Sequence, residues 1–383
     1  MKILVISADF PPWDGGIAQV GYEYARTFCD LGHQVTVLAP HYRNCTDWDS
    51  AQPFKIVRYR THNAFIIHFW LLRIALSRLF DRQAFDWVLS MRWNLDGIAF
   101  NGRHRTTSIF QWFHGNELFD RHLNQPRWAA RLNTLMESAG INIAISHYTA
   151  DLIARHFPSC PRVRTVHLGI DSQRFRPPKS VEAAKAALGW QGKRVILSLS
   201  RLVKRKGHEL VIKSLAHTGG LNNTIYVIAG KGSYESTLRQ MVAQAGLQNQ
   251  VHFAGFVSEK QKVLYYQACD IYVMPSRSEE KRGDVEGFGL TYLEANACGK
   301  PVIGGRQGGC MEAIDEGVSG LLVDPDKEAE MAQALKRLLL DAGFYEQLSR
   351  KGLERVRQSF SWEASCQKLL ALHASARPWR MNY

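Results

Sequence analysis

Residues 285–304 read VEGFGLTYLEANACGKPVIG. Glycines stand on both sides of Phe288, and the residues that follow predict a helix from about Leu290 to Cys298. The run Pro301–Gly304 comes next and has the length and composition of a buried strand. Loop, helix and strand in this order make one step of a βαβ chain, so the segment predicts a parallel α/β sheet.

The same alternation of apolar runs and helical stretches extends along the whole chain. The second half contains the candidate strands Arg194–Ser200, Thr224–Ala229, Val251–Phe256, Asp270–Pro275, Pro301–Gly304 and Gly320–Val323. The first half contains Lys2–Ser7, Gln34–Ala39, Lys55–Arg60, Asp86–Met91, Thr107–Phe113, Ile141–Ser146 and Val163–Leu168. Several of these runs are continuously apolar, which is typical of parallel strands covered on both faces.

The two series of strands predict two domains. A chain of 383 residues is long for one ordinary core. The stretch Gly169–Lys179 (GIDSQRFRPPK) is rich in turn residues and prolines, so we place the linker there. The predicted domains are residues 1–168 and 169–361. Residues 362–376 predict a further amphipathic helix, and we expect the segment 362–383 to complete the first domain.

Composition predicts a cytoplasmic protein. Seven cysteines are scattered along the chain without a CxxC pair or a Cys/His cluster, as is typical of reduced thiols. The apolar run Ile3–Ile6 directly after Met1-Lys2 reads as a strand rather than as a signal peptide. The formal net charge of +13 favours an anionic partner, namely nucleic acid, a membrane surface or a phosphate ligand.

The segment Phe65–Arg82 is apolar on nearly all faces, with Arg73 and Arg78 inserted at different angles. Its apolar part is shorter than the ~20 residues that a membrane span needs. One interpretation is a buried helix whose arginines extend outward. The other is a helix that docks at an anionic membrane, at its inner face, to reach a lipid-linked acceptor. Between Lys55 and Arg82 there are six basic residues and one acid, which agrees with the second interpretation.

Loops after the strands carry the candidate chemistry, since ligands of open α/β sheets bind beyond the carboxyl ends of strands. The first such loop is ADFPPWDGG, in which Gly15 and Gly16 would let backbone N–H groups approach a phosphate or sugar. A turn without a ligand is the alternative. The next strand ends Leu38-Ala39-Pro40-His41, without the acid of a dinucleotide site, so the sequence argues against an NAD enzyme.

In the second half, the loop SRLVKRKG places Arg201 and Lys206 five positions apart, before Gly207. Two cations at one strand end would make a clamp for a diphosphate. Arg205 is a competing basic residue, and a solvated basic loop is the alternative interpretation. A second glycine-rich strand end follows at residues 229–233, AGKGS.

Glu286 and Glu294 form an E-x7-E pattern, with Glu286 in the loop before the predicted helix and Glu294 on it. A phosphate would be stabilised at the helix N-terminus near Leu290. Glu294 could then accept hydrogen bonds from a ribose diol, and Glu286 from sugar hydroxyls. The alternative is a capping acid followed by an ordinary surface glutamate.

Together these motifs resemble glycosyltransferase family 4, the retaining transferases with two facing Rossmann-like domains and a cleft between them (the GT-B fold). The resemblance covers nearly the whole chain. It rests on ADFPPWDGG, HGNE at 114–117, HLGIDSQRFRP, SRLVKRKG, IAGKGSYE and the E-x7-E of VEGFGLTYLEA.

The resemblance implies a role for each motif. Arg201 and Lys206 contact the donor pyrophosphate, Glu286 the transferred sugar and Glu294 the ribose, while His114 lies near the reacting carbon. A structural histidine is the alternative for His114. The predicted catalytic residues are His114, Arg201, Lys206 and Glu286, and the predicted donor-binding residues are Gly15, Gly16, Gly230, Gly232, Gly287, Phe288, Gly289, Leu290 and Glu294.

The predicted reaction needs no cofactor and no metal, because Arg201, Lys206 and helix amides would stabilise the charge on the leaving diphosphate. The alternative is a reaction that requires a metal ion, because the chain contains two D-x-D patterns that could bind one, Asp47–Asp49 and Asp324–Asp326. We expect a retaining hexosyltransferase that uses UDP-glucose or, next, GDP-mannose. Its acceptor would be a glycan or a lipid-linked molecule of cell-surface polysaccharide or glycolipid synthesis.

Two other classes stay open, a nucleotide-sugar epimerase of the same fold and a basic nucleic-acid-binding protein. No aromatic-basic binding motif accompanies the charge, so a nucleic-acid partner is not expected.

Overall fold

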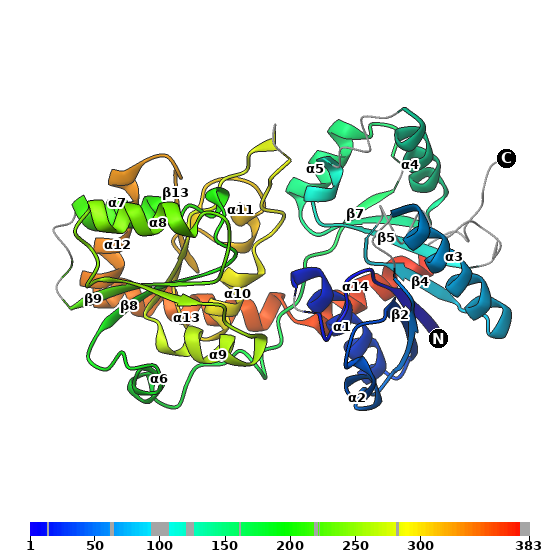
Figure 1. The fold of residues 1–383 in the computed structure, drawn as a ribbon, viewed down its shortest axis with the longest axis horizontal. Helices are drawn as coiled ribbons and strands as arrows, with labels where there is room; N and C mark the ends of the chain where they lie inside the picture. Colours follow the sequence, from blue (N-terminus) through cyan, green and yellow to red (C-terminus); the bar gives the residue numbers. More distant parts are fainter. Residues whose placement is uncertain are drawn as a thin grey trace. The chain divides into compact units, whose positions relative to one another are not determined.

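The computed structural model describes residues 1–13, 15–61, 65–92, 107–119, 126–160, 162–217, 221, 223–280 and 283–375. The chain divides into a first unit, Met1–Gly169 with Trp362–Tyr383, and a second unit, Ile170–Ser361. The domain boundary that we predicted, between residues 168 and 169, lies beside this division. Each unit contains its own parallel sheet flanked by helices, which confirms the predicted α/β class (Figure 1).

The first unit has a seven-stranded parallel sheet in the order β3-β2-β1-β4-β5-β6-β7. Its strands are β1 Lys2–Ile6, β2 Gln34–Pro40, β3 Lys55–Tyr59, β4 Trp87–Ser90, β5 Ser108–Phe113, β6 Ile141–Ala144 and β7 Val163–Thr165. Its helices are α1 Gly16–Asp30, α2 Cys45–Ser50, α3 Phe65–Arg82, α4 Pro126–Ser138, α5 His147–His156 and α14 Trp362–Ser375. Each strand coincides with a predicted apolar run to within a few residues.

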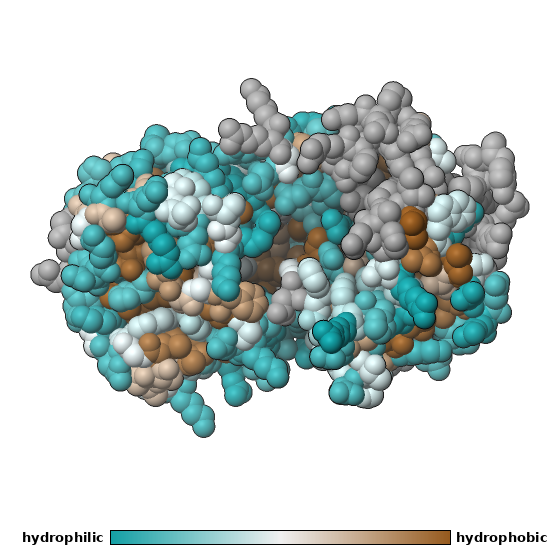
Figure 2. Space-filling view, viewed as in Figure 1, coloured by the Kyte–Doolittle hydropathy of each residue, from teal (hydrophilic) through white to brown (hydrophobic). Residues whose placement is uncertain are grey.

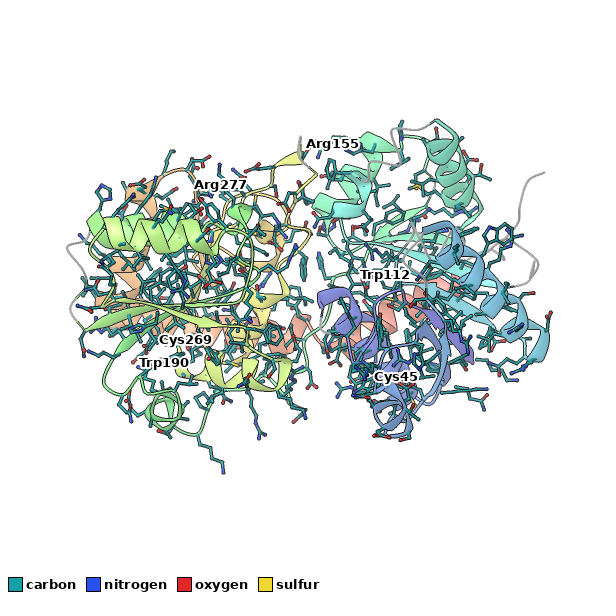
Figure 3. The ribbon with its side chains drawn as sticks, viewed as in Figure 1. Cys45, Trp112, Arg155, Trp190, Cys269 and Arg277 are labelled. Carbon is teal, nitrogen blue, oxygen red and sulfur yellow. The ribbon has the colours of Figure 1, made fainter. Side chains whose placement is uncertain are left out.

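The C-terminal helix α14 is part of the first unit because α1 and β5 provide its aromatic contacts. The Tyr24 ring of α1 lies 5.0 Å from the rings of both Trp112 and Trp362, centroid to centroid. The Tyr24 hydroxyl also makes a 2.8 Å hydrogen bond with Ser365 Oγ. Trp112, labelled in Figure 3, is fully buried, so this aromatic cluster fixes α14 to the first sheet.

The second unit has a six-stranded parallel sheet in the order β10-β9-β8-β11-β12-β13. Its strands are β8 Arg194–Leu199, β9 Thr224–Ala229, β10 Val251–Gly255, β11 Ile271–Met274, β12 Val302–Gly305 and β13 Gly320–Val323. Its helices are α6 Val181–Ala187, α7 His208–His217, α8 Glu235–Gln244, α9 Glu259–Ala268, α10 Leu290–Ala297, α11 Cys310–Ala313, α12 Glu328–Leu340 and α13 Ala342–Ser359. All residues of β9 and β11 are buried, as expected for strands covered on both faces.

Helix α3 has one buried and one exposed apolar face. Leu72, Leu76 and other side chains are buried, whereas Ile67, Trp70 and Ile74 are 44%, 52% and 45% exposed. Positions 67, 70 and 74 form one stripe of a helix. Figure 2 shows brown, apolar surface where Figure 1 draws α3. The interpretation of this segment as a buried helix with outward arginines is therefore confirmed for one face only, since Arg78 and Arg82 are exposed but so is the stripe of apolar side chains.

Among the described residues, no helix combines the length and the apolar character that crossing a bilayer requires. Within the part of the chain that the structure describes, the cysteines form no disulfide.

Candidate functional site

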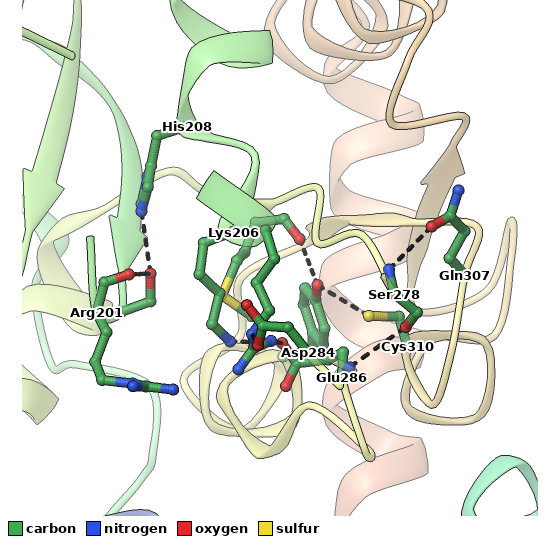
Figure 4. Close-up of polar contacts among 12 residues, drawn as sticks. Arg201, Lys206, His208, Ser278, Asp284, Glu286, Gln307 and Cys310 are labelled. Atoms are coloured by element: carbon green, nitrogen blue, oxygen red, sulfur yellow. Dashed lines mark hydrogen bonds and ion pairs between the residues drawn. The ribbon is translucent and has the colours of Figure 1, made fainter. Parts of the chain in front are cut away.

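The strand order of the second sheet reverses between β8 and β11, and the loops after these two strands meet. The loop after β8 ends in the 3₁₀ helix Lys204–Lys206, and the loop after β11 carries Glu286. Lys206 Nζ lies 2.5 Å from Glu286 Oε2 (Figure 4). Open α/β sheets bind ligands outside such a reversal point, so the structure places two predicted catalytic residues at the expected location.

Arg205 joins the same cluster. Its Nη1 lies 2.7 Å from Glu286 Oε2, and its Nε lies 2.5 Å from Asp284 Oδ1. The Arg205 side chain is only 6% exposed. The interpretation of this segment as a solvated basic loop is therefore wrong for Arg205 and for Lys206. Two cations and two carboxylates compensate one another in the cluster, which explains how Arg205, Lys206 and Glu286 can be largely buried; Asp284 is 42% exposed.

The charges in this cluster shift the pKa values of its members. Burial alone raises the pKa of the Glu286 carboxyl, but the ammonium of Lys206 and the guanidinium of Arg205 outweigh it and lower this pKa to about 2. Burial lowers the pKa of Lys206 from its usual value, although the Glu286 carboxylate opposes that effect. Glu286 is thus an anion at neutral pH, able only to accept hydrogen bonds.

The backbone of Glu286 is fixed by neighbouring loops. Its N–H donates to Ser278 Oγ at 3.3 Å, and its carbonyl accepts from the N–H of Gly309 at 2.8 Å. A Cβ on Gly309 would lie 2.1 Å from the Gly287 carbonyl oxygen, so only glycine permits this approach. Helix α10 begins after Gly289, whose φ of 96° is left-handed, and no side chain caps it. Glu286 is therefore not a capping acid.

Glu294 lies on α10 and is 7% exposed. Its Oε1 accepts a 2.7 Å bond from Lys262 Nζ, and its Oε2 accepts a 2.7 Å bond from the Tyr266 hydroxyl. Lys262 and Tyr266 are four residues apart on α9 and therefore share one face of that helix. The interpretation of Glu294 as an ordinary surface glutamate is wrong. Sequence reasoning missed both partners, although their spacing was a usable signal.

The other predicted residues of the second unit occupy the same sheet edge. Arg201 is exposed and makes no ion pair with any residue that the structure describes, which leaves its guanidinium open to a ligand. A Cβ on Gly230 would lie 1.8 Å from the Ser200 carbonyl oxygen, and one on Gly232 would lie 2.1 Å from that of Leu202. Contact between the loops after β8 and β9 is therefore sufficient to explain these two glycines.

Two residues between Glu286 and Glu294 differ in exposure. The Phe288 side chain is 2% exposed, and its ring lies 6.1 Å from that of Phe360, so it has a place in the core of the second unit. Leu290 is half-buried as the first residue of α10.

The first unit carries the remaining predicted residues. Gly15 and Gly16 stand at the start of α1, and a Cβ on Gly16 would meet nothing within 4 Å. His114 follows β5, and its Nε2 lies 2.9 Å from the Met91 carbonyl oxygen. Burial lowers the pKa of His114, so its imidazole is neutral at pH 7, with Nε2 as the donor to Met91.

Each D-x-D pattern has carboxylates paired with basic side chains, namely Asp49 in the first and both aspartates in the second. Asp49 Oδ1 lies 2.6 Å from Arg58 Nη2, and Asp326 Oδ1 lies 3.0 Å from Arg277 Nε. Asp324 pairs with a lysine three residues ahead.

A half-open cavity of about 540 Å³ lies in the second unit and includes none of the predicted site residues. It is lined by α7, α8 and the loops after β8, β11, β12 and β13. Its charged walls are Lys204, Lys213, Arg277, Glu209, Glu279 and Asp326, so basic and acidic groups balance.

Two family descriptions match the chain. "Glycosyltransferase Family 4" matches residues 14–174, and "Glycosyl transferases group 1" matches residues 180–355. The two matches therefore correspond to the first and second units.

Individual proteins are also similar over nearly the whole chain. A GDP-mannose-dependent alpha-(1-6)-phosphatidylinositol monomannoside mannosyltransferase of Mycobacterium tuberculosis is 27% identical, over 96% of this chain and 97% of its own. Sucrose-phosphate synthase of Thermosynechococcus elongatus has a TM-score of 0.81 at 21% identity, over 98% of both chains. HepE of Anabaena in complex with UDP-glucose has a TM-score of 0.80 at 21% identity, over 98% of this chain and 100% of its own.

Proposed function

Because this chain belongs to the family 4 glycosyltransferases, we propose that it is a retaining hexosyltransferase that uses a nucleotide-diphosphate sugar and needs no metal. That the chain is a glycosyltransferase of the GT-B fold follows from the two family matches and the similarity of fold. The observation that carries the finer proposal is the Lys206–Glu286 pair at the reversal point of the second sheet, with the exposed Arg201 on the same loop.

The donor that we propose first is GDP-mannose, and UDP-glucose is second. Whole-length similarity to a GDP-mannose-dependent mannosyltransferase supports this order. The sequence-based expectation puts UDP-glucose first, so this order is the reverse. The likeness to HepE, a protein solved with UDP-glucose, does not restore that preference, because it rests on 21% identity and concerns the fold alone. For the acceptor we propose a glycan or a lipid-linked molecule.

In the proposed reaction, the bond between the anomeric carbon and the diphosphate oxygen breaks while the acceptor hydroxyl forms a bond on the same face of the sugar. The acceptor proton passes to a phosphate oxygen of the leaving group. Arg201 and Lys206 would stabilise the charge that grows on the diphosphate, which is the task a metal has in other transferases. Glu286 would accept hydrogen bonds from the sugar hydroxyls, and the neutral His114 would be a further polar contact near the reacting carbon.

Helix α3 supports a peripheral contact with an anionic membrane. Its exposed stripe, Ile67, Trp70 and Ile74, is apolar, and Arg78 and Arg82 on the same helix are also exposed. Apolar side chains next to arginines suit the boundary between acyl chains and anionic headgroups. A protein held there would reach an acceptor whose lipid part stays in the bilayer.

A panel of nucleotide sugars tests the function. The purified chain is incubated with GDP-mannose, UDP-glucose and related donors in EDTA, and release of the nucleoside diphosphate is measured. Proton NMR of the first-formed glycoside then gives its anomeric configuration. We expect turnover with one donor in the presence of EDTA and an α-linked product from an α-linked donor. Turnover that needs added Mn²⁺ or Mg²⁺, or a β-linked product, would exclude the proposed mechanism.

A further inference from the structure

The proposed diphosphate clamp consists of Arg201 and Lys206 and does not include Arg205. Arg205 is nevertheless among the most buried cations of the second unit. We infer that Arg205 is the positioning residue of Glu286. It holds one carboxylate oxygen in place, so that the other faces the donor sugar while Lys206 binds the diphosphate. The inference rests on the proposed function, since it concerns the same donor site.

The contacts of the two Glu286 oxygens differ. Oε2 accepts from both Arg205 Nη1, at 2.7 Å, and Lys206 Nζ, at 2.5 Å. The hydrogen bonds and ion pairs of the Glu286 side chain within the described part of the chain are all on Oε2, none on Oε1. The guanidinium is a rigid planar fork, and its Nε is paired with Asp284 Oδ1 at 2.5 Å. Arg205 is thus held by carboxylates at two of its nitrogens and can fix the orientation of the Glu286 carboxylate.

The charges of the cluster show why a second cation is needed. Lys206 is compensated by Glu286 in the structure, but a bound diphosphate would compete for its ammonium. The ammonium sits on a flexible stem and can turn toward the phosphate. If Lys206 were the sole partner of Glu286, this movement would leave the carboxylate without the contact that orients it. Arg205 keeps its contact with Oε2 and holds the carboxylate in the orientation that the donor sugar needs.

Arg205 itself is poorly placed to be a phosphate ligand. Its side chain is 6% exposed, and two of its guanidinium nitrogens already face carboxylates. Its carbonyl oxygen also accepts a 2.7 Å bond from the N–H of Arg277, which ties the loop after β8 to the loop after β11. Arg201 on the same loop is exposed and is the better candidate for that contact.

Calorimetry with paired ligands separates positioning from phosphate binding. GDP and UDP probe the diphosphate contacts alone, whereas GDP-mannose and UDP-glucose add the sugar. Arg205→Met removes the charge at similar length. One of the two nucleoside diphosphates, GDP or UDP, is expected to bind the wild type. We expect the affinity of Arg205→Met for that diphosphate to differ from the wild-type affinity by less than about threefold. Loss of a charge-assisted contact to Glu286 should reduce kcat/KM for the matching nucleotide sugar by about tenfold or more.

Two graded variants and one control complete the experiment. Arg205→Lys should recover part of the lost kcat/KM, and Asp284→Asn should show a smaller loss in the same direction. Arg306→Met is the matched control, because Arg306 also bridges two carboxylates of the second unit, Glu316 and Glu330, outside the site. It should leave both affinities and turnover unchanged.

The outcomes are distinguishable. Equal weakening of diphosphate and nucleotide-sugar binding in Arg205→Met would make Arg205 a phosphate ligand and overturn the inference. Unchanged kcat/KM in Arg205→Met would overturn it as well. If the wild type bound neither diphosphate nor nucleotide sugar, the proposed function would fail and the inference with it. Unaltered diphosphate binding by Arg205→Met also shows that this variant is folded.

Discussion

Lys206 and Glu286, eighty positions apart in the chain, form an ion pair of 2.5 Å across the reversal point of the second sheet. The cation proposed for the diphosphate and the carboxylate proposed for the sugar thus neutralise each other in the structure. In the proposed reaction, donor binding would therefore exchange this pair for contacts with the ligand.

Glu286→Gln tests this exchange. Removing the carboxylate charge frees Lys206, so we expect the affinity for the free nucleoside diphosphate to be unchanged or higher. Transfer should nevertheless become slower by about 10²–10³, because the contact with the reacting sugar is lost. Calorimetry and steady-state kinetics on one preparation measure both quantities. Loss of diphosphate binding in this variant would show that Glu286 supports the phosphate contacts instead.

Arg201→Ala and Lys206→Ala should each slow transfer by about 10²–10³, because each removes a charge-assisted bond to the leaving group. Lys204→Ala is a matched control from the same loop, since Lys204 lines the separate cavity. Its turnover should equal that of the wild type. Wild-type turnover in the Arg201/Lys206 double variant would remove the basis for the clamp.

How much the sequence could predict depends on the range of the interaction. The strands that the structure describes were largely predictable from apolar runs, because parallel strands covered on both faces, such as β9 and β11, are apolar along their length. The positions of Glu286 in a loop and Glu294 on a helix followed from local pattern. The burial of Arg205 did not, because Lys204, Arg205 and Lys206 are three successive cations, and the pairing of Arg205 with distant Asp284 and Glu286 cannot be read from local sequence.

Helix α3 shows a different limit. Its sequence is apolar on nearly all faces, so periodicity could not indicate which face the sheet covers. Tertiary contacts bury Leu72 and Leu76 and leave Ile67, Trp70 and Ile74 exposed.

The exposed stripe of α3 yields a prediction about membranes. The triple variant Ile67→Ser, Trp70→Ser, Ile74→Ser should bind vesicles containing anionic lipid more weakly than the wild type in a co-sedimentation assay. Wild-type binding should also fall as ionic strength rises, because the attraction to the headgroups is screened. Leu340→Ser, which changes a 66% exposed leucine of the second unit, is the control. Equal binding to neutral and anionic vesicles by the wild type would refute a charge-driven contact.

Acid should weaken the second unit through Glu286. The pKa of its carboxyl is lowered from 4.5 to about 2 in the folded chain. Between these values the unfolded chain binds more protons, so this contribution to stability is complete above about pH 4.5 and is lost as the pH falls toward about 2. Urea unfolding over this range should show the free energy of unfolding falling with pH more steeply for the wild type than for Glu286→Gln. Identical slopes would mean that the Glu286 pair does not stabilise the fold.

The central claim is that the charged cluster at the reversal point of the second sheet is the donor site. A crystal structure of the chain with a non-hydrolysable analogue of its preferred nucleotide sugar tests this most directly. We expect Arg201 and Lys206 at hydrogen-bonding distance from the diphosphate, Glu286 bonded to sugar hydroxyls, and Arg205 still paired with Glu286. A diphosphate bound instead in the cavity beside Lys204 and Arg277, with Lys206 still ion-paired with Glu286, would contradict the account.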